Sequence, residues 1–424
     1  MNAVAQQVAP AAESAQAGPR RRPRWFWYAV LGGALLVLAT VRVITGAHDI
    51  DSSGALAAAI GLAMPLALAG LGGLWSERAG VVNIGLEGMM ILGTWGGAFF
   101  GYHYGPWAGI FGAVLMGVVA GAIHALATVI FGVDHIVSGV AVNLLGAGAG
   151  AYLAVRTFSN LPDGGPTQSP PLKLLPFLSV PGVGDPLLSL EQSHTWLVAD
   201  IAGILRAMTT NVNVLTIIAV VLLVLSWWLL WRTPFGLRLR SCGEAPQAAE
   251  TLGINVIKFK FVAVLISGGL AGLAGGFLVL VASNLYREGQ TGGRGYIGLA
   301  AMIFGNWRPG GLGGAAALFG YADAIQLRGR GDVIHAYLLP LGVLLLAWGV
   351  WQVVRRRQGK PMVGVSRVVI GVLVLVWFAI TKEVAAEFTS MTPYIVTLLV
   401  LVFASQRLRM PAADGQIYRK GEAK

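Results

Sequence analysis

The sequence predicts an all-α polytopic membrane protein with about ten transmembrane helices plus a short helical hairpin. Hydrophobic residues make up 56% of the chain and charged residues only 12%, whereas soluble domains are about a quarter charged. Apolar runs long enough to cross the roughly 30 Å hydrocarbon core of a bilayer recur along the chain. The 59 glycines follow no collagen period, so we expect them to allow close packing between helices.

Basic residues gather at the ends of the predicted spans, and most of these clusters fall on one side when successive spans alternate in direction. Lys and Arg mark the cytoplasmic side, so both termini are expected there, and the +11 formal charge needs no nucleic acid to explain it. The apolar run at 296–304 is too short to span, and a second apolar run follows at 312–327, so the two are expected to form a helical hairpin or two short helices with irregular backbone between them. The full spans are expected at 25–46, 54–75, 81–101, 107–131, 136–155, 212–231, 261–285, 333–354, 363–380 and 393–404.

The transmembrane domain is expected to cover residues 25–405, between a disordered cytoplasmic tail at 1–24 and a cytoplasmic C-terminal tail at 406–424. One long polar stretch, 156–211, is rich in Pro, Gly and Ser and falls on the extracytoplasmic side. Its later part, 195–208, has the pattern of an amphipathic helix that lies at the membrane surface.

The chain is organised around the polar segment 233–260, which predicts a short cytoplasmic helix between two spans. Pro246 suits the first position of a helix, and Gly253 suits the position just past its end. A helix of one or two turns is marginal alone in water, so we expect it to dock into another protein. The alternative is a solvated loop that contains a helical turn.

Glu87 is the principal polar candidate within the early spans. Helical periodicity places Asn83, Glu87 and Thr94 on one face. A carboxylate inside a span costs several kcal/mol unless it faces a partner or water, so Glu87 is predicted to be a pathway or gate residue. The alternative is that Glu87 lies near enough to the cytoplasmic edge to reach water or to pair with Arg78.

Other polar side chains extend this set. Asn143 is the deeper of two polar residues in its span and is a candidate substrate contact, whereas His135 more often would be an anchored surface histidine. Asn306, Trp307 and Arg308 at the tip of the predicted hairpin combine an amide, an aromatic ring and a cation, which suits a ring-bearing polar solute. The same three residues equally suit a turn that orders the two short helices. Asp323 and Gln326 are the remaining buried polar candidates.

Sequence motifs for enzymatic chemistry are absent. Without a Gly-x-x-x-x-Gly-Lys-Ser/Thr phosphate loop, the chain cannot hydrolyse ATP alone. There is no His-Glu-x-x-His, Cys-x-x-Cys or Gly-x-Ser-x-Gly, so neither a metal nor a cofactor is expected, and the single Cys242 excludes an intrachain disulfide. An ion-coupled secondary transporter would use carboxylates deep in several spans together with inverted repeats, and only Glu87 and Asp323 qualify.

Several separated stretches resemble the membrane permeases of bacterial nucleoside-type ABC importers, within the branched-chain amino acid, ribose and nucleoside permease superfamily. The resemblance runs from about Gly54 to the end of the chain. The stretches that carry it occur in the family's order, at 77–89, 233–236 with 243–249, 304–309, 319–324 and 408–418.

The resemblance implies the ABC importer permease fold and import of a nucleoside or related small polar solute across the bacterial plasma (inner) membrane. It implies a separate ABC ATPase subunit, a second homologous permease subunit and an extracytoplasmic substrate-binding lipoprotein. The ATPase coupling residues would be Gly243, Glu244, Pro246, Ala248, Ala249, Glu250 and Gly253. The substrate pathway would include Asn83, Glu87, Trp95, Asn143, Asn306, Trp307, Arg308 and Asp323.

Two departures from the family pattern bear on the choice of substrate. Residues 333–380 look like an extra helix pair, and the outer loop 156–211 is long. A permease for a sugar or an amino acid is therefore the first alternative.

Overall fold

The computed structural model describes residues 24–328, 331–355, 361–404 and 408–421. The predicted disordered tail at 1–24 lies outside these residues, apart from Arg24. The sheet found within the described residues is one antiparallel pair, β1 (Phe177–Leu178) and β2 (Val212–Asn213), which closes the long polar stretch. Everything else that is regular in the described residues is helical, which confirms the all-α class.

A core bundle carries most of the buried side chains. It consists of α2 (Ser53–Arg78), α3 (Leu86–Tyr104), α4 (Pro106–Ala125), α5 (His135–Phe158), α8 (Val214–Arg232) and α11 (Val256–Phe277). Helices α4 and α11 continue through π-helical turns at Leu126–Ile130 and Leu278–Ala282.

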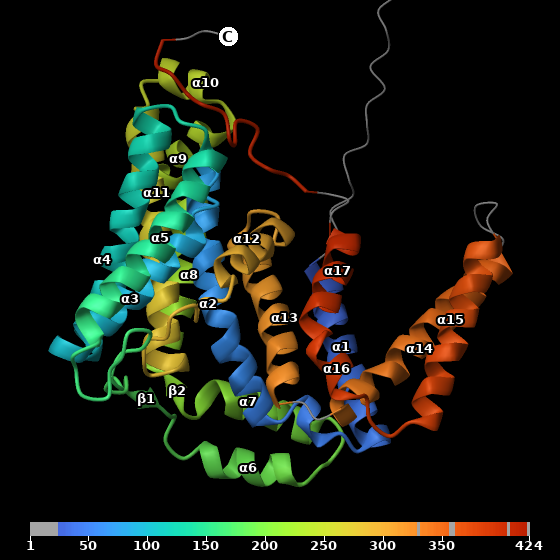
Figure 1. The fold of residues 1–424 in the computed structure, drawn as a ribbon. Helices are drawn as coiled ribbons and strands as arrows, with labels where there is room; N and C mark the ends of the chain where they lie inside the picture. The colour runs from blue at the N-terminus through green and yellow to red at the C-terminus, as the bar shows by residue number, and fades with distance from the viewer. Residues whose placement is uncertain (1–23, 329–330, 356–360, 405–407, 422–424) are drawn as a thin grey trace, which may run out of the picture.

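Helices α12 (Arg294–Phe304) and α13 (Pro309–Arg328) form the predicted hairpin and lie between the core bundle and an outlying group of helices (Figure 1). The pair α14–α15 packs on itself at the far edge of that group. The outlying group comprises α1 (Arg24–Thr45), α14 (Gly331–Arg355), α15 (Pro361–Ile380), α16 (Ala386–Ser390) and α17 (Thr392–Ala404).

The two ends of the bundle carry different short helices (Figure 1). One end, here the α10 end, carries α9 (Pro234–Glu244) and α10 (Pro246–Thr251). The opposite end, the α6 end, carries α6 (Gly184–Gln192), α7 (Val198–Thr209) and a 3-10 turn at His48–Ile50. Helix α7 is the predicted amphipathic helix, whereas α6 was not anticipated.

Within the described residues, seven helices are long and apolar enough to cross a membrane. The other three predicted spans fall on α1, α3 and α17, which are also helical. The chain is therefore a multi-pass membrane protein. The seven segments are His48–Arg78, Pro106–Ile130, His135–Phe158, Val214–Arg232, Val256–Ala282, Gly331–Arg355 and Met362–Ile380.

Glycines bring the backbones of α3, α4 and α11 into contact, which confirms the close helix packing expected from the glycine content. A Cβ atom added at Gly93 would lie 2.3 Å from the carbonyl oxygen of Gly272, and one at Gly117 would lie 2.2 Å from that of Gly268. A Cβ at Gly272 would itself lie 2.3 Å from the carbonyl oxygen of Ala113. Such distances leave no room for any side chain.

Replacing Gly272 by valine is therefore expected to lower the melting temperature of the detergent-purified protein markedly, because overpacking a core of this kind costs about 1–3 kcal/mol or more. The matched control is Gly148→Val in α5, where nothing lies within 4 Å of the added Cβ. Thermal unfolding curves of both variants check this prediction. Equal melting temperatures would contradict the close packing of α4 on α11.

The predicted span at 81–101 starts too early. Residues 81–85 are not helical, and α3 begins at Leu86. Gly80 adopts a φ of +82°, and the Asn83 side-chain oxygen accepts a hydrogen bond from the Gly85 N–H at 3.0 Å. This local bond competes with a helix, so Asn83 does not share a helical face with Glu87 and Thr94.

Candidate functional site

Glu87 binds the N-terminal end of α12. Its two carboxylate oxygens accept hydrogen bonds from the backbone N–H groups of Gly293, at 2.9 Å, and Gly295, at 2.7 Å. A Cβ atom on Gly295 would lie 2.7 Å from the Glu87 backbone, so this approach requires glycine. The N-terminus of a helix carries a partial positive charge, which stabilises a carboxylate in this buried position. The alternative pairing of Glu87 with Arg78 is wrong, because Arg78 donates to the Trp307 carbonyl instead.

Asn143 of α5 connects the same region to the start of α3. Its side-chain oxygen accepts from the Gly88 N–H at 2.7 Å, and its amide nitrogen donates to the Ile84 carbonyl and to the Tyr296 hydroxyl, each at 2.9 Å. Asn143 is half-buried, and 46% of Tyr296 is exposed. Two predicted pathway residues, Glu87 and Asn143, are thus brought together around the first turn of α12.

Asp323 approaches the same turn from α13. It is half-buried, and the cation that acts on it is Arg294, the first residue of α12. The guanidinium of Arg294 donates to the carbonyl oxygens of Gln290 and Thr291. We call the five residues gathered here the α12 cluster: Glu87, Asn143, Arg294, Tyr296 and Asp323.

Two other predicted pathway residues are held elsewhere. Asn83 is fully buried, and its amide nitrogen donates to the Ser267 hydroxyl of α11 at 2.8 Å. Trp95 donates through its indole N–H to the Thr157 hydroxyl and stacks on Phe99, with ring centroids 5.2 Å apart. Both side chains pack helices together, and neither contacts the α12 cluster through these bonds.

The hairpin tip forms the turn between α12 and α13, at the other end of α12 from the cluster. An 11-residue helix separates them, a length of about 16 Å. Asn306 and Trp307 both have positive φ angles, +56° and +52°. The buried Trp307 indole donates to a carboxylate oxygen of Glu77. Arg308 is exposed.

Helix α10 has the ends that the sequence predicts. Pro246 is its first residue, and Gly253 follows its last turn with a φ of +81°. Ala249 packs against α9 and α11 with Cys242 and Val256. Leu252, the residue after the last turn of α10, is by contrast 81% exposed. Of the other predicted coupling residues, Gly243 is buried, Glu250 is half-buried, and Glu244 and Ala248 are exposed.

The family described as "branched-chain amino acid transport system / permease component" matches residues 55–348, which include the α12 cluster and α10. The chain belongs to this family. Its members are transport components, so the chain is a permease and not an enzyme.

Three curated relatives match this permease over most of their length. The guanosine ABC transporter permease protein NupQ of Bacillus subtilis is 34% identical, over 85% of this chain and 94% of the relative. The nucleoside ABC transporter permease protein NupC of Lactococcus lactis is 30% identical, over 84% and 94%. The putative glucose ABC transporter permease protein TsgC13 of Haloferax volcanii is 32% identical, over 87% and 98%. No solved structure matches the permease.

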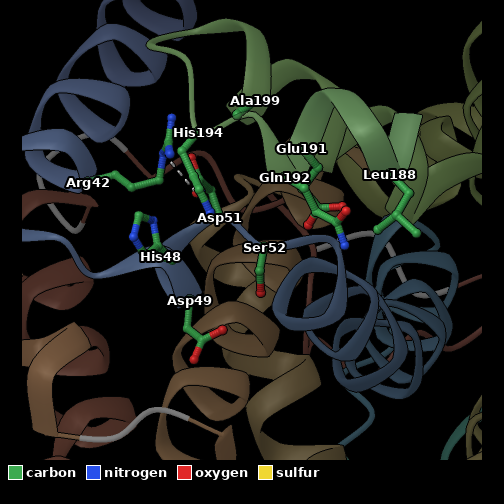
Figure 2. A pocket seen from close by; sticks show the side chains of 10 residues that line it. All are labelled: Arg42, His48, Asp49, Asp51, Ser52, Leu188, Glu191, Gln192, His194 and Ala199. Carbon is green, nitrogen blue, oxygen red and sulfur yellow. Dashed lines mark ion pairs between the residues drawn. The ribbon is translucent and has the colours of Figure 1, made fainter. Parts of the chain in front are cut away.

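Sequence reasoning missed a charged cavity of about 200 Å³ at the α6 end of the permease. Figure 2 shows its side chains converging from α1, from the loop before α2 and from the α6–α7 region. The Arg42 guanidinium lies 2.7 Å from the Asp200 carboxylate and 3.6 Å from that of Asp51, and the His48 and His194 rings lie 4.2 Å apart. Burial opposes ionisation of Asp200, but the hydrogen bond from Arg42 holds its pKa below its ordinary value.

A single signal pointed to this ion pair. Arg42 is a lone cation within a predicted span, and Asp200 is a lone acid in the predicted amphipathic helix. Each would be costly to bury alone, so each needs a partner. The sequence does not say which partner, because 158 residues separate the two.

Proposed function

We propose that this permease imports a nucleoside into the cell as the membrane subunit of an ABC importer, with ATP hydrolysed by a separate ATPase subunit. The observation that carries the proposal is the extended likeness to two relatives named as guanosine and nucleoside permeases, at 34% and 30% identity. The polar α12 cluster and the protruding α10 are the features of this chain that such a function would use.

Helix α10 is the proposed coupling helix. Its inner side packs on α9 and α11, so it moves with the bundle, while Leu252 is available to a partner. An exposed leucine at the end of a short, firmly packed helix suits a hydrophobic groove on the ATPase. Gly243, Glu244, Pro246, Ala248, Ala249, Glu250 and Gly253 would form or support this contact.

The α12 cluster is the proposed polar part of the substrate pathway. Asn143 and the exposed part of Tyr296 present an amide and a phenol, which can hydrogen-bond a ribose or a base. Glu87 already uses both oxygens on α12, so its role is to position that helix. Asp323 and Arg294 would supply a negative and a positive charge beside the proposed substrate pathway. Trp95, Asn83 and the 306–308 turn would act by supporting the helices around the cluster.

Orientation and partners complete the proposal. The basic residues around α9 and α10 support an orientation in which that end faces the cytoplasm of a bacterial plasma membrane, and both termini would lie on the same side. The α6 end would then face outward and receive a substrate-binding lipoprotein. A second homologous permease would complete the translocation unit. In this arrangement the transmembrane domain would cover 25–405, with the extracytoplasmic loop at 156–211, the cytoplasmic coupling segment at 233–260 and the extra helix pair at 333–380.

Uptake of labelled guanosine by cells that have or lack this gene tests the proposal. We expect uptake that requires the gene and that unlabelled nucleosides suppress. The likeness to a relative named as a putative glucose permease makes glucose the second candidate. Gene-dependent uptake of glucose without uptake of guanosine would establish that alternative and overturn the nucleoside assignment.

A further inference from the structure

We propose that residues 408–418 form a clamp that joins the α9–α10 segment to the α12–α13 turn and passes movement of α10 on to α12. In Figure 1 the C-terminal segment from residue 408 crosses the α10 end of the bundle toward α10. This inference rests on the proposed function, because it takes α10 to be the helix that the ATPase moves.

One part of the clamp binds the end of α9. The Ala413 N–H donates to the Gly243 carbonyl at 2.9 Å, and the Ala412 N–H donates to the Glu244 carboxylate at 3.2 Å. Gly243 is pressed so closely on α2 that a Cβ atom there would lie 2.4 Å from the Arg78 carbonyl oxygen. The clamp is therefore attached where α9 meets α2, and α10 begins at Pro246, two residues after Glu244.

Another part of the clamp binds the hairpin turn. The Arg409 N–H donates to the Asn306 side-chain oxygen at 2.7 Å. The turn has little freedom to move independently of α2, because the next residue, Trp307, is bonded through its indole to Glu77 and through its carbonyl to Arg78. A displacement of Arg409 would therefore act on the turn as a whole.

The middle of the clamp is anchored by a buried acid. Asp414 is only 8% exposed, and its carboxyl group lies against that of Glu77. Apart from Glu77, no described residue donates a hydrogen bond to either side-chain oxygen of Asp414. Two buried carboxyl groups can share a hydrogen bond only if one of them holds a proton. This packing is that of a structural element and not of a solvated tail.

The clamp then continues beside α10. Lys260 of α11 donates to the Gly80 carbonyl and lies with its ammonium 6.0 Å from the Tyr418 ring centroid. Tyr418 and Glu250 both line a cavity of about 490 Å³ next to α10. The same segment thus touches both the proposed coupling helix and the hairpin turn.

These contacts make a continuous route to the α12 cluster. It runs from α10 through Gly243 and the clamp to Asn306, and then along α12 to Gly293 and Gly295, which bind Glu87. A helix of this length transmits displacement as a rigid body. The route therefore predicts that one change at Asn306 alters both the docking of the clamp and the coupling of ATP hydrolysis to import.

Two variants of Asn306 distinguish the effect of losing the hydrogen bond to the clamp from the effect of changing the turn. Glycine and aspartate both tolerate the φ of +56°, but only aspartate keeps an oxygen for the Arg409 N–H. We expect Asn306→Gly to make tryptic cleavage after Arg409 about tenfold faster, as loss of one such bond allows, and Asn306→Asp to resemble the wild type. In proteoliposomes that also contain the ATPase and the binding protein, N306G should import several-fold less labelled guanosine per ATP hydrolysed.

The outcomes distinguish this inference from the proposed function. If N306G releases the tail yet imports as much guanosine per ATP as wild type, the clamp does not transmit movement. If N306D loses coupling as fully as N306G, the turn and not the hydrogen bond is responsible, which also overturns the clamp. If removing 246–252 leaves ATPase binding intact, the coupling assignment of α10 fails independently of either result.

The buried acid pair adds a pH dependence. Burial raises the pKa of Asp414 to about 7, while Glu77, Lys260 and Arg78 act against the rise. A raised carboxyl pKa favours the docked clamp at low pH, and this contribution is lost as pH rises through about 7. The ratio of wild-type to Asp414→Asn tryptic cleavage rates should therefore be greater at pH 8 than at pH 6. The same ratio at both pH values would contradict a shared proton at this position.

Discussion

Leu252→Asp is expected to abolish ATP-driven import while the membrane domain stays folded. Leu252 is 81% exposed and follows the last turn of α10, so the change costs the isolated permease little. In a hydrophobic groove of the ATPase, by contrast, an unpaired carboxylate costs several kcal/mol. That penalty weakens the complex by about a hundredfold or more.

Co-purification of the ATPase with tagged permease measures this effect directly. Leu252→Met is the matched control, because it keeps the length and apolar character of the side chain, and it should retain the ATPase at the wild-type ratio. Recovery of equal ATPase with L252D and wild type would show that the partner does not bind through α10. The melting temperature of L252D should equal that of wild type, which separates loss of binding from loss of fold.

Glu87→Ala is expected to lower both stability and import. The substitution leaves the half-buried N–H of Gly293 and the buried N–H of Gly295 without their acceptor. Each unsatisfied buried donor costs about 1–3 kcal/mol, so detachment of the first turn of α12 should cost a few kcal/mol. Asn143 would lose its alignment with Tyr296, which lies in that turn.

Glu87→Gln distinguishes an anchoring carboxylate from a charge that acts on the solute. Its amide offers one acceptor to two donors, so an anchoring role predicts that the melting temperature falls almost as far as in E87A. A charge that serves only the pathway predicts an unchanged melting temperature together with lost uptake. Thermal unfolding and guanosine uptake of both variants therefore decide between the two roles. A fully stable E87Q would contradict the anchoring role.

Much of the helical architecture could be predicted from the sequence, because length and apolar character are local properties. The short runs at 296–304 and 312–327 became the hairpin α12–α13, and Pro246 and Gly253 mark the ends of α10 as their backbone preferences require. Asn83 was misplaced because its span looks continuously apolar. The turn at 81–85 depends on the φ of Gly80 and on one side-chain bond, which hydropathy does not register.

The candidate site was harder to predict because it depends on long-range contacts. Glu87 and Asn143 were recognised as polar residues in apolar spans, but their common partner, the start of α12, lies about 200 residues away from Glu87. Asp414 belongs to a tail that composition describes as polar and solvated, yet it is buried against Glu77. Charged and polar residues within apolar spans can be recognised in a sequence, whereas their partners, and the burial of a charge outside the spans, are set by the fold.

The most direct test of the account is ATP-dependent accumulation of labelled guanosine by proteoliposomes that contain this permease, its ATPase and its binding protein. We predict accumulation against a concentration gradient with the wild type, none without ATP, and none with L252D although its membrane domain remains folded. ATP-independent accumulation, or full activity of L252D, would contradict an importer that is driven through α10.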